Sequence, residues 1–259
     1  MIVGLIGCGN IGMELAAFLD RSPFFSLKYV YDIDGSSANR LISQLSSKPR
    51  KTSVDELVRN SDLIIEAASP EAVHALLQRD MSGKMDMDGK KLLVMSVSGL
   101  IDQDLDGLEV YVPSGAIAGI DALKAVASEI RTLKLITTKS PTSLEGAPYL
   151  VEKKIDVSSI AQKTTVFSGN LRDAIRGFPK NINIAATISL AVGRDMEVEI
   201  IADPSVTTNT HRILCSGEFG SFDFLVENKQ SKNPKTSYLA VLSAIQCLRN
   251  VEQKIRIGS

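Results

Sequence analysis

The sequence predicts an α/β fold, in which a doubly wound parallel sheet is followed by a second domain of the α+β class. Up to Val112, short apolar runs alternate with segments of helical periodicity, and a glycine-rich turn joins the first run to the first helix. After Ser114, several segments alternate apolar and polar residues with period two. Alternating strands and helices are typical of parallel sheets, whereas period-two strands are typical of mixed or antiparallel sheets.

The N-terminal stretch is predicted to form a strand, a tight turn and a helix. Ile2 to Ile6 is an apolar run of the kind found in strands that are buried on both faces. Gly7, Gly9 and Gly12 then fit the pattern G-x-G-x-x-G. Gly7 permits a sharp turn, Gly9 lets a pyrophosphate approach the backbone, and Gly12 lets the helix lie close to the strand. The free N–H groups at the helix N-terminus favour the phosphates.

A second predicted strand, Leu27–Tyr31, ends at Asp32, twenty residues after Gly12. A carboxylate at this distance accepts hydrogen bonds from an adenosine ribose, so the whole pattern predicts a Rossmann-type dinucleotide site. The predicted cofactor-binding residues of this motif are Gly7, Gly9, Asn10, Ile11, Gly12 and Asp32. Because a carboxylate repels a 2′-phosphate, NAD is favoured over NADP, although the nearest arginine, Arg40, leaves NADP open. The alternative is a methyltransferase, which has a similar first loop and acidic strand end but binds S-adenosylmethionine.

Composition and charge argue against several classes of protein. The chain has 259 residues, enough for one large domain or two modest ones, and its net charge of −1 without a long basic run predicts no nucleic-acid surface. No apolar stretch approaches the roughly 18 residues that span a bilayer, and the N-terminus lacks the features of a signal peptide. The scattered cysteines, Cys8, Cys215 and Cys247, predict neither disulfides nor a metal site. We therefore expect a cytoplasmic protein that does not bind membranes.

Strands and helices are predicted to keep alternating through the first domain. We expect helices over 36–45, 54–58 and 71–79, and strands over 62–66, 90–95 and 108–112. Ser53 and Glu56 have capping-box spacing at the start of the second of these helices. Ligands of parallel sheets bind at the carboxyl ends of the strands. The turn after residue 66, with Ala67 and Ala68, and the turn Ser96–Gly99 are therefore expected to face the cofactor.

The second domain is predicted to contain a mixed or antiparallel sheet. The segment Ser114–Leu123 is rich in small residues and is predicted to begin a helix. We expect strands over 132–138, 163–168, 196–202, 211–216 and 221–228, and helices over 170–176 and 181–192. A polar linker, 228–234, precedes a last predicted helix over 236–251.

One candidate for substrate chemistry is the start of the predicted helix over 181–192. A proline sets this helix start, which presents Lys180, Asn181 and Asn183. An ammonium and two amides at a helix N-terminus suit a carboxylate or the carboxamide of a nicotinamide. The same residues are equally typical of a capped helix whose polar side chains are solvated.

Two further candidates come from strand ends. His211 closes a polar loop and opens a strand, and its unperturbed pKa of about 6.5 suits proton transfer near neutral pH. The alternative for His211 is a structural hydrogen bond at a strand edge. Thr137, Thr138 and Lys139 end another strand, where hydroxyls and an ammonium are suited to a substrate carboxylate or form a solvated strand end.

Several segments, taken in order, resemble the L-aspartate dehydrogenase family. They run through most of the chain with compatible spacing: GLIGCGNIG, EAASPEAV, SGAIAGIDAL, FPKNINIAAT, the ADP…NTHRI stretch, GEFG and NPKTSYLA. The resemblance implies an N-terminal Rossmann domain, an α+β second domain and a C-terminal helix that returns to the first domain. It thus implies a cofactor domain of residues 1–121 and 235–259, and a substrate and catalytic domain of residues 122–234.

The resemblance also implies a reaction and residue roles. The family oxidises the 2-amino group of L-aspartate to iminoaspartate with NAD or NADP, and iminoaspartate hydrolyses to oxaloacetate and ammonia or feeds NAD biosynthesis. His211 matches the catalytic histidine, and Ala116 and Asn181 match positions that contact NAD. His211 is then either the base that takes an ammonium proton or the group that orders the attacking water. The resemblance does not itself assign the substrate-binding residues. From the chemistry of their side chains, we infer as candidates Thr137, Thr138, Lys139, Lys180 and Asn183.

Two segments depart from the family pattern, and several alternatives stay open. Relatives usually continue Arg-Lys after the two threonines, whereas this chain has Lys139-Ser140, which bears on substrate selectivity. The turn Ser96–Gly99 differs from the usual Ser-Thr-Gly-Ala, which bears on contacts to the nicotinamide. The alternatives are a related amino-acid or homoserine-type dehydrogenase, a dihydrodipicolinate-like reductase, and a redox sensor that binds NAD(H) without turnover. A homodimer is expected by analogy with other dehydrogenases.

Overall fold

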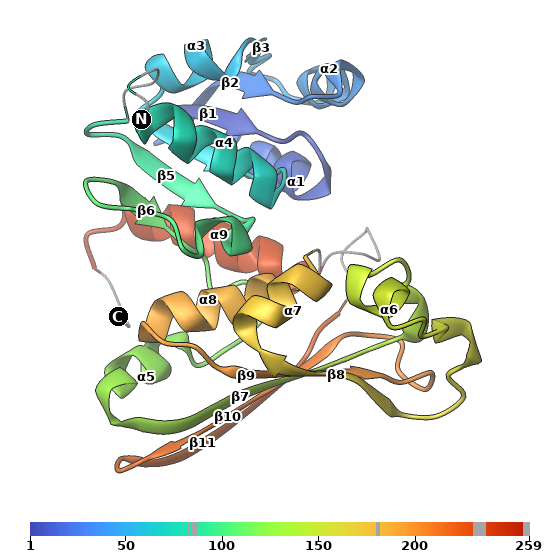
Figure 1. Ribbon diagram of the computed structural model, residues 1–259. Helices are drawn as coiled ribbons and strands as arrows, with labels where there is room; N and C mark the ends of the chain where they lie inside the picture. The colour runs from blue at the N-terminus through green and yellow to red at the C-terminus, as the bar shows by residue number, and fades with distance from the viewer. Residues whose placement is uncertain (82, 84–86, 180–181, 230–236, 256–259) are drawn as a thin grey trace. The chain divides into compact units, whose positions relative to one another are not determined.

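The computed structural model describes residues 1–81, 83, 87–179, 182–229 and 237–255. The chain forms two compact units, each with its own sheet (Figure 1). The first unit comprises Met1–Pro113 and Val241–Ile255, so its two segments are far apart in the sequence. The second unit runs from Ser114 to Ala240.

The first unit contains a six-stranded parallel sheet with the order β3-β2-β1-β4-β5-β6. Its strands are β1 (Ile2–Ile6), β2 (Ser26–Tyr31), β3 (Arg50–Lys51), β4 (Leu63–Glu66), β5 (Lys91–Val94) and β6 (Glu109–Tyr111). The strand order reverses between β1 and β4, which is the point where ligands of doubly wound sheets bind. The predicted parallel, doubly wound sheet is confirmed.

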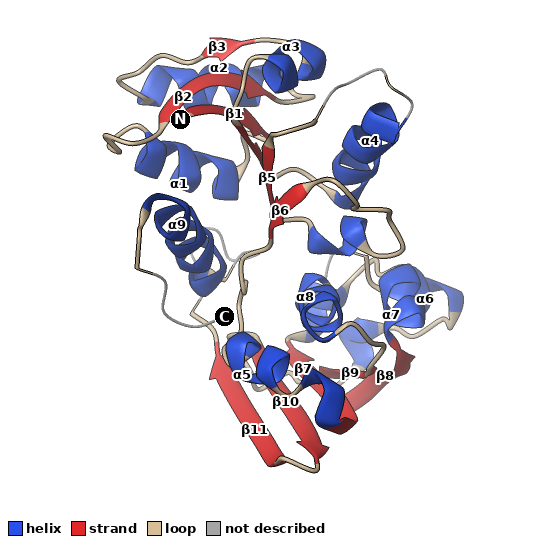
Figure 2. Ribbon diagram, turned by 90° about the vertical axis from the view of Figure 1, so that its left-hand side faces the viewer, coloured by secondary structure: helices blue, strands red, loops and turns tan. Residues whose placement is uncertain are grey.

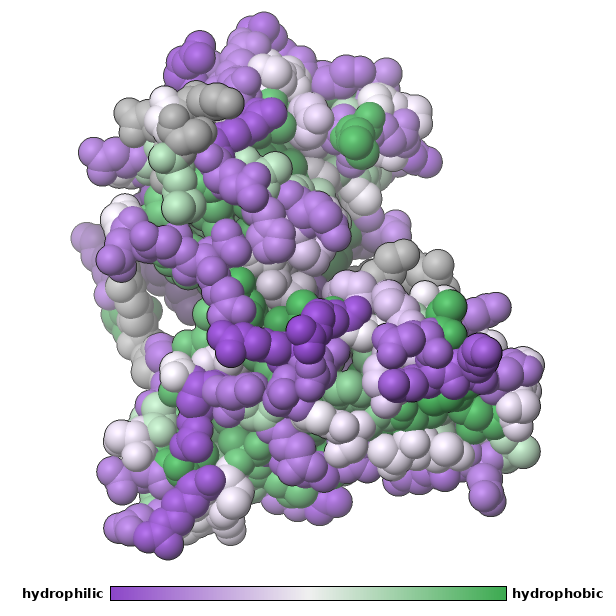
Figure 3. Space-filling view, viewed as in Figure 1, coloured by the Kyte–Doolittle hydropathy of each residue, from purple (hydrophilic) through white to green (hydrophobic). Residues whose placement is uncertain are grey.

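Helices cover both faces of this sheet. They are α1 (Asn10–Leu19), α2 (Gly35–Gln44), α3 (Val54–Arg59), α4 (Pro70–Met81) and α9 (Tyr238–Glu252). Figure 2 shows α1 and α9 on one side of the sheet and α3 and α4 on the other. The core on the α1 side joins Leu5 of β1 to Leu15 of α1, Leu41 of α2 and Leu248 of α9, all of them buried. Over α3 and β3 the surface is mostly hydrophilic, as the amphipathic pattern of a covering helix requires (Figure 3).

The second unit contains a five-stranded mixed sheet with the order β11-β10-β7-β9-β8. Its strands are β7 (Ile130–Lys139), β8 (Thr164–Asn170), β9 (Glu197–Ala202), β10 (Thr210–Gly217) and β11 (Gly220–Glu227). The pair β7 and β9 is parallel, and the other neighbouring pairs are antiparallel. Among its helices, α5 (Ile120–Ala125), α7 (Leu171–Gly177) and α8 (Asn183–Val192) lie on one face of the sheet (Figures 1 and 2). The sheet is therefore mixed, which is one of the two predicted alternatives.

The structure differs from the sequence-based expectation mainly in short elements. The two-residue strand β3 and the five-residue helix α6 (Pro148–Glu152) are too short to show a period. The helix expected near Ser114 begins only at Ile120, because Gly119, immediately before it, has the left-handed φ of +82°. No helix among the described residues is long and apolar enough to cross a membrane.

Candidate active site

In the glycine-rich turn after β1, neighbouring backbone segments approach so closely that two of the glycines could not carry a side chain. Gly7 has a φ of +94°, and a Cβ at this residue would lie 2.5 Å from the carbonyl oxygen of Ala67. A Cβ at Gly12 would lie 2.0 Å from the carbonyl oxygen of Gly7. A Cβ at Gly9, in contrast, would have no atom within 4 Å, so space is open beside the N-terminus of α1. This open space and the free N–H groups of α1 fit a pyrophosphate.

Asp32 is held in place by two backbone donors. The N–H of Cys8, inside the glycine-rich turn, donates to Oδ2 of Asp32 at 2.6 Å, and the N–H of Asp34 donates to Oδ1 at 2.8 Å. The carboxylate is therefore fixed between the turn and the start of α2. Burial, and then the charge of Asp32, raise the pKa of the Cys8 thiol to about 12, which keeps this thiol protonated. Cys8 thus fills the turn between Gly7 and Gly9.

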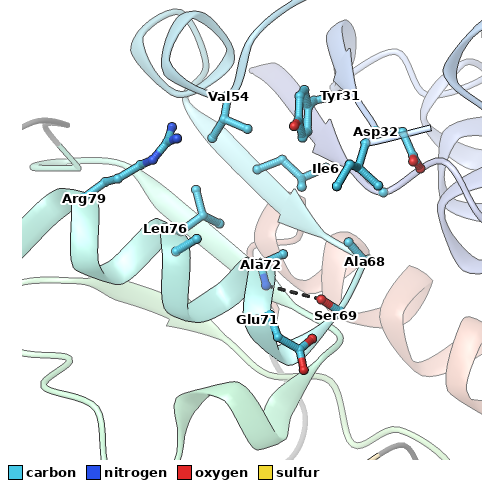
Figure 4. Close-up of a pocket in the computed structure, with 13 residues that line it drawn as sticks. Ile6, Tyr31, Asp32, Val54, Ala68, Ser69, Glu71, Ala72, Leu76 and Arg79 are labelled. Atoms are coloured by element: carbon cyan, nitrogen blue, oxygen red, sulfur yellow. Dashed lines mark hydrogen bonds between the residues drawn. The ribbon is translucent and has the colours of Figure 1, made fainter. Parts of the chain in front are cut away.

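A cavity of about 320 Å³ opens beside Asp32 (Figure 4). Figure 4 shows Asp32 and Tyr31 toward one end and Arg79 of α4 at the other, with Val54 and Leu76 along the walls. The full lining is Ile6, Gly7, Tyr31, Asp32, Ile33, Val54, Ala68, Ser69, Glu71, Ala72, Ala75, Leu76 and Arg79. An apolar slot with a carboxylate at its end fits the adenosine part of a dinucleotide.

The structure brings most of the predicted cofactor residues of the first unit together. Gly7, Asp32 and Ala68 line the cavity itself. Asn10 and Ile11 begin α1, beside the open space at Gly9. Ala67 lies against the glycine-rich turn, because its N–H donates to the carbonyl of the β1 residue Ile6 at 2.8 Å and its own carbonyl faces Gly7. All of these residues lie at the carboxyl ends of β1, β2 and β4.

In the second unit, His211 and Thr137 face each other across two strands. His211 of β10 pairs with Thr137 of β7, and Nδ1 of His211 lies 3.0 Å from Oγ1 of Thr137. Lys139 lies two residues further along β7, so its side chain shares their face of the sheet. All three are buried, with 3%, 4% and 7% of His211, Thr137 and Lys139 exposed. We call these three residues the His211 cluster.

Burial changes the basicity of both ionisable groups in the His211 cluster. Burial, with the nearby positive charge of Lys139 as the lesser cause, lowers the pKa of His211 to about 3. Burial lowers the pKa of Lys139 to about 8. The sequence gives only the unperturbed pKa of an imidazole, because it does not show that the ring lies inside the unit. His211 is neutral at neutral pH, and its hydrogen bond to Thr137 fixes the ring whichever nitrogen carries the hydrogen.

One other predicted substrate residue points away from this cluster, one begins a helix, and two lie outside the described residues. Thr138 points to the opposite face of the sheet from Thr137 and Lys139, as the period of a strand requires. Asn183 is the first residue of α8, and its main-chain carbonyl accepts a hydrogen bond from Oγ1 of Thr187 at 2.9 Å. Lys180 and Asn181 lie outside the described residues.

Two buried polar residues near the predicted site, Asn228 and Glu66, were not predicted from the sequence. Nδ2 of Asn228 donates to the carbonyl of Ala116 at 2.9 Å, and Oγ of Ser237 donates to Oδ1 of Asn228 at 2.7 Å. Asn228 is 3% exposed and thus fixes the small-residue segment that contains Ala116. Glu66, at the end of β4, is completely buried. Neither had a signal in the sequence, because Asn228 began a polar linker and Glu66 ended an apolar run.

Among the described residues, no group of three or more His, Cys, Asp or Glu side chains could hold a metal ion.

Comparison with known proteins distinguishes the dehydrogenase alternatives. A family model of the NAD-binding domain of homoserine dehydrogenase matches residues 7–108, and a model of the C-terminal domain of aspartate dehydrogenase matches residues 121–251. Only the second match separates aspartate from homoserine enzymes.

Curated relatives match the whole chain. The L-aspartate dehydrogenases of Methanococcoides burtonii and Nitrosopumilus maritimus are 40% and 37% identical to it, over 99% of this chain and 99% of each relative. The chain belongs to the L-aspartate dehydrogenase family. The first unit therefore contains the NAD(P)-binding domain of this family. The aspartate dehydrogenase model covers residues 121–251, most of which lie in the second unit.

Solved structures agree with membership in the L-aspartate dehydrogenase family. The crystal structure of aspartate dehydrogenase from Thermotoga maritima superposes with a TM-score of 0.72 and 29% identity, over 100% of this chain and 99% of that one. GenD2 from gentamicin A biosynthesis, solved in complex with NAD, gives a TM-score of 0.52 at 10% identity, over 97% and 85% of the two chains. The second likeness shows the fold alone.

Proposed function

We propose that this chain catalyses the NAD(P)-dependent oxidative deamination of L-aspartate to iminoaspartate, which water converts to oxaloacetate and ammonia. The observation that carries this proposal is the match to L-aspartate dehydrogenases over 99% of the chain, including the second unit. The buried His211 cluster supports it, since a dicarboxylic amino acid needs a cation and a proton acceptor. We assign cofactor binding to residues 1–121 and 235–259, and substrate chemistry to residues 122–234.

The residues of the first unit are suited to hold the cofactor. The open space at Gly9 and the start of α1 would take the pyrophosphate, and Asp32 would accept the hydroxyls of the adenosine ribose. When bound, the nicotinamide supplies the hydride acceptor of the reaction. In the second unit, Ala116 and Asn181 are further proposed contacts to the cofactor.

NAD is the proposed cofactor rather than NADP. The carboxylate of Asp32 lies at the end of the adenosine cavity, and a 2′-phosphate there would meet this negative charge. Asp34, two residues on, is also ionised at neutral pH, and hydrogen bonds from Ser37 and Ser36 lower its pKa further, to about 2. The next residue after Asp32 is Ile33, which is 94% exposed and offers no positive charge.

The His211 cluster is suited to the substrate end of the reaction. As Cα loses a hydride, the nitrogen must form a double bond to Cα, so the ammonium group has to give up a proton. The neutral ring of His211 has a lone pair, but with a pKa of about 3 it is a weak base before substrate binds. A carboxylate of L-aspartate next to Lys139 would offset the positive charge that lowers the pKa of His211, and so would strengthen the base.

His211 has two proposed roles, and both use the same position. It takes a proton from the substrate nitrogen, or it orders the water that attacks the imine carbon. Thr137 orients the ring in either case, through the bond of 3.0 Å to Nδ1. Lys139 is proposed to bind a substrate carboxylate, with Thr138, Lys180 and Asn183 as further candidates.

A panel of substrates tests the proposed reaction. Reduced cofactor is followed at 340 nm with L-aspartate, L-homoserine, L-glutamate and D-aspartate, each with NAD and with NADP. We expect turnover with L-aspartate alone, and a kcat/KM at least about 10-fold higher with NAD than with NADP, from the charge of Asp32. Equal use of both cofactors would contradict the role of Asp32. Turnover of L-homoserine instead would favour the homoserine-type alternative.

The redox-sensor alternative gives a different result in the same panel. Such a protein binds NAD(H) but reduces no cofactor with any amino acid.

A homodimer in the cytoplasm is also part of the proposal. The three free cysteines, Cys8, Cys215 and Cys247, are typical of a reducing compartment.

A further inference from the structure

Glu66 is a buried carboxyl group to which the reaction proposed above gives no role. It is the last residue of β4 and is 0% exposed. Its neighbours in the sheet are Ile6 of β1 and Val94 of β5, so it lies at the carboxyl edge of the central strands. Burying a carboxylate costs free energy unless its oxygens accept hydrogen bonds, so the donors around Glu66 are what stabilise it there.

The two oxygens of Glu66 accept hydrogen bonds from two different turns. Oε1 accepts from the N–H of Ala68 at 2.7 Å and from Oγ of Ser96 at 2.8 Å. Oε2 accepts from the N–H of Ser96 at 3.0 Å. Ala68 belongs to the turn after β4, and Ser96 begins the turn after β5, 30 residues further along the chain. One side chain thus joins the turns at the ends of two neighbouring strands.

Both turns lie in contact with other parts of the predicted cofactor site. Ala68 lines the adenosine cavity, and its backbone nitrogen would be 2.8 Å from a Cβ placed at Gly7. The turn after β5 touches the start of α4, since a Cβ at Gly99 would lie 2.8 Å from the carbonyl oxygen of Pro70. A shift of either turn would therefore move backbone groups at the carboxyl ends of β1, β4 and β5.

We propose that Glu66 is a positioning residue for the cofactor, because it holds the turns after β4 and β5 in one fixed arrangement. The proposal rests on the NAD(P)-binding role of the first unit. Glu66 does not touch the cofactor itself in this account, because its side chain is buried behind the turns that it joins. The ionised form suits the geometry, since every bond described above places a donor against one of its oxygens. Burial raises the pKa of Glu66, and the hydrogen bonds from Ser96 and Ala68 act against this rise.

The variant Glu66→Gln tests this proposal, because it keeps the size of the side chain but replaces one acceptor by a donor. The amide NH₂ would face an N–H or O–H group that now donates to Glu66. We expect the Kd for NADH, measured by fluorescence titration of the folded protein, to rise by about 10-fold or more. The KM for L-aspartate at saturating NAD is expected to change by less than about 2-fold, because the His211 cluster lies in the other unit.

A second variant keeps the test decisive if Glu66→Gln fails to fold. Ser96→Ala removes only the hydroxyl donor and leaves the N–H bond to Oε2, so a smaller rise of about 3-fold in the Kd for NADH is expected. Ser61→Ala is the matched control. Ser61 is 1% exposed and its Oγ donates to the carbonyl of Leu57 at 2.7 Å, but it precedes β4 at the opposite end of the strand. Ser61→Ala is expected to leave the Kd for NADH within about 2-fold.

The outcomes separate this proposal from the proposed reaction. An unchanged Kd for NADH in Ser96→Ala and in folded Glu66→Gln would overturn the role of Glu66, whatever the activity. A parallel rise in the Kd for NADH and the KM for L-aspartate, with the same loss of thermal stability as in Ser61→Ala, would show a general structural role and also overturn it. A wild-type protein that binds NADH but does not oxidise L-aspartate would contradict the proposed reaction and leave the measurement on Glu66 valid.

Discussion

Replacing His211 by alanine is expected to lower kcat for L-aspartate oxidation by about 100-fold or more, since this is the usual contribution of a positioned acid or base. The Kd for NADH is expected to stay within about 2-fold, because the adenosine cavity and the glycine-rich turn lie in the first unit. Steady-state kinetics and fluorescence titration of the same preparation measure the two quantities. The alanine also leaves a small cavity beside Thr137, so a control for packing is needed.

Ile213→Val is the matched control for His211→Ala. Ile213 lies two residues further along β10, on the same face of the sheet, and is 0% exposed. Loss of one methyl group there is expected to lower thermal stability slightly and leave kcat within about 2-fold. A kcat for His211→Ala that equals the kcat of this control would remove His211 from the reaction and leave it a structural residue.

Replacing Lys139 by methionine is expected to raise the KM for L-aspartate by about 10- to 100-fold, the effect of losing a hydrogen bond between charged groups. Methionine keeps the unbranched, apolar stem in its buried position, so the change removes the charge with little change of volume. Lys134→Met is the control, because Lys134 lies on the same strand but binds Glu197 and Glu199 at the surface. An unchanged KM in Lys139→Met would show that this lysine does not bind a substrate carboxylate.

The pH dependence of KM gives an independent signature of Lys139. Because burial lowers its pKa to about 8, the side chain is charged below this pH and becomes neutral above it. The charged form binds a carboxylate, so 1/KM for L-aspartate is expected to fall as the pH rises through about 8. This fall is expected to be absent in Lys139→Met.

The first unit could be predicted almost completely from the sequence because its signals are local. The run Leu63–Glu66 is a strand buried on both faces, and the glycine turn and Asp32 follow spacing rules that hold within one strand–helix–strand segment. The capping box was predicted in the same way, and Oγ of Ser53 accepts from the N–H of Glu56 at 3.2 Å. The second hydrogen bond of a capping box would run from the N–H of Ser53 to the Glu56 carboxylate. In the structure this carboxylate instead binds Arg50 and Thr52.

The candidate site was predicted less completely, because its contacts join residues that are far apart in the chain. His211 and Thr137 are 74 residues apart, and only the register of β7 against β10 brings them together. The period of β7 explains why Thr137 and Lys139 face His211 whereas Thr138 does not, but the sequence does not say which face is buried. Burial in turn decides both pKa shifts. Glu66 was missed for a similar reason, since its partner Ser96 lies in the turn after the neighbouring strand, 30 residues further along the chain.

The transfer of deuterium from L-[2-²H]aspartate to NAD tests the central claim most directly, because it follows the bond that the proposed reaction breaks. We expect the reduced cofactor, detected by its absorbance at 340 nm, to carry one deuterium at C4 of the nicotinamide. We also expect kcat/KM to be lower than with unlabelled L-aspartate if hydride transfer limits this rate. Reduced cofactor without deuterium, or no reduction by a protein that binds NADH, would contradict the account.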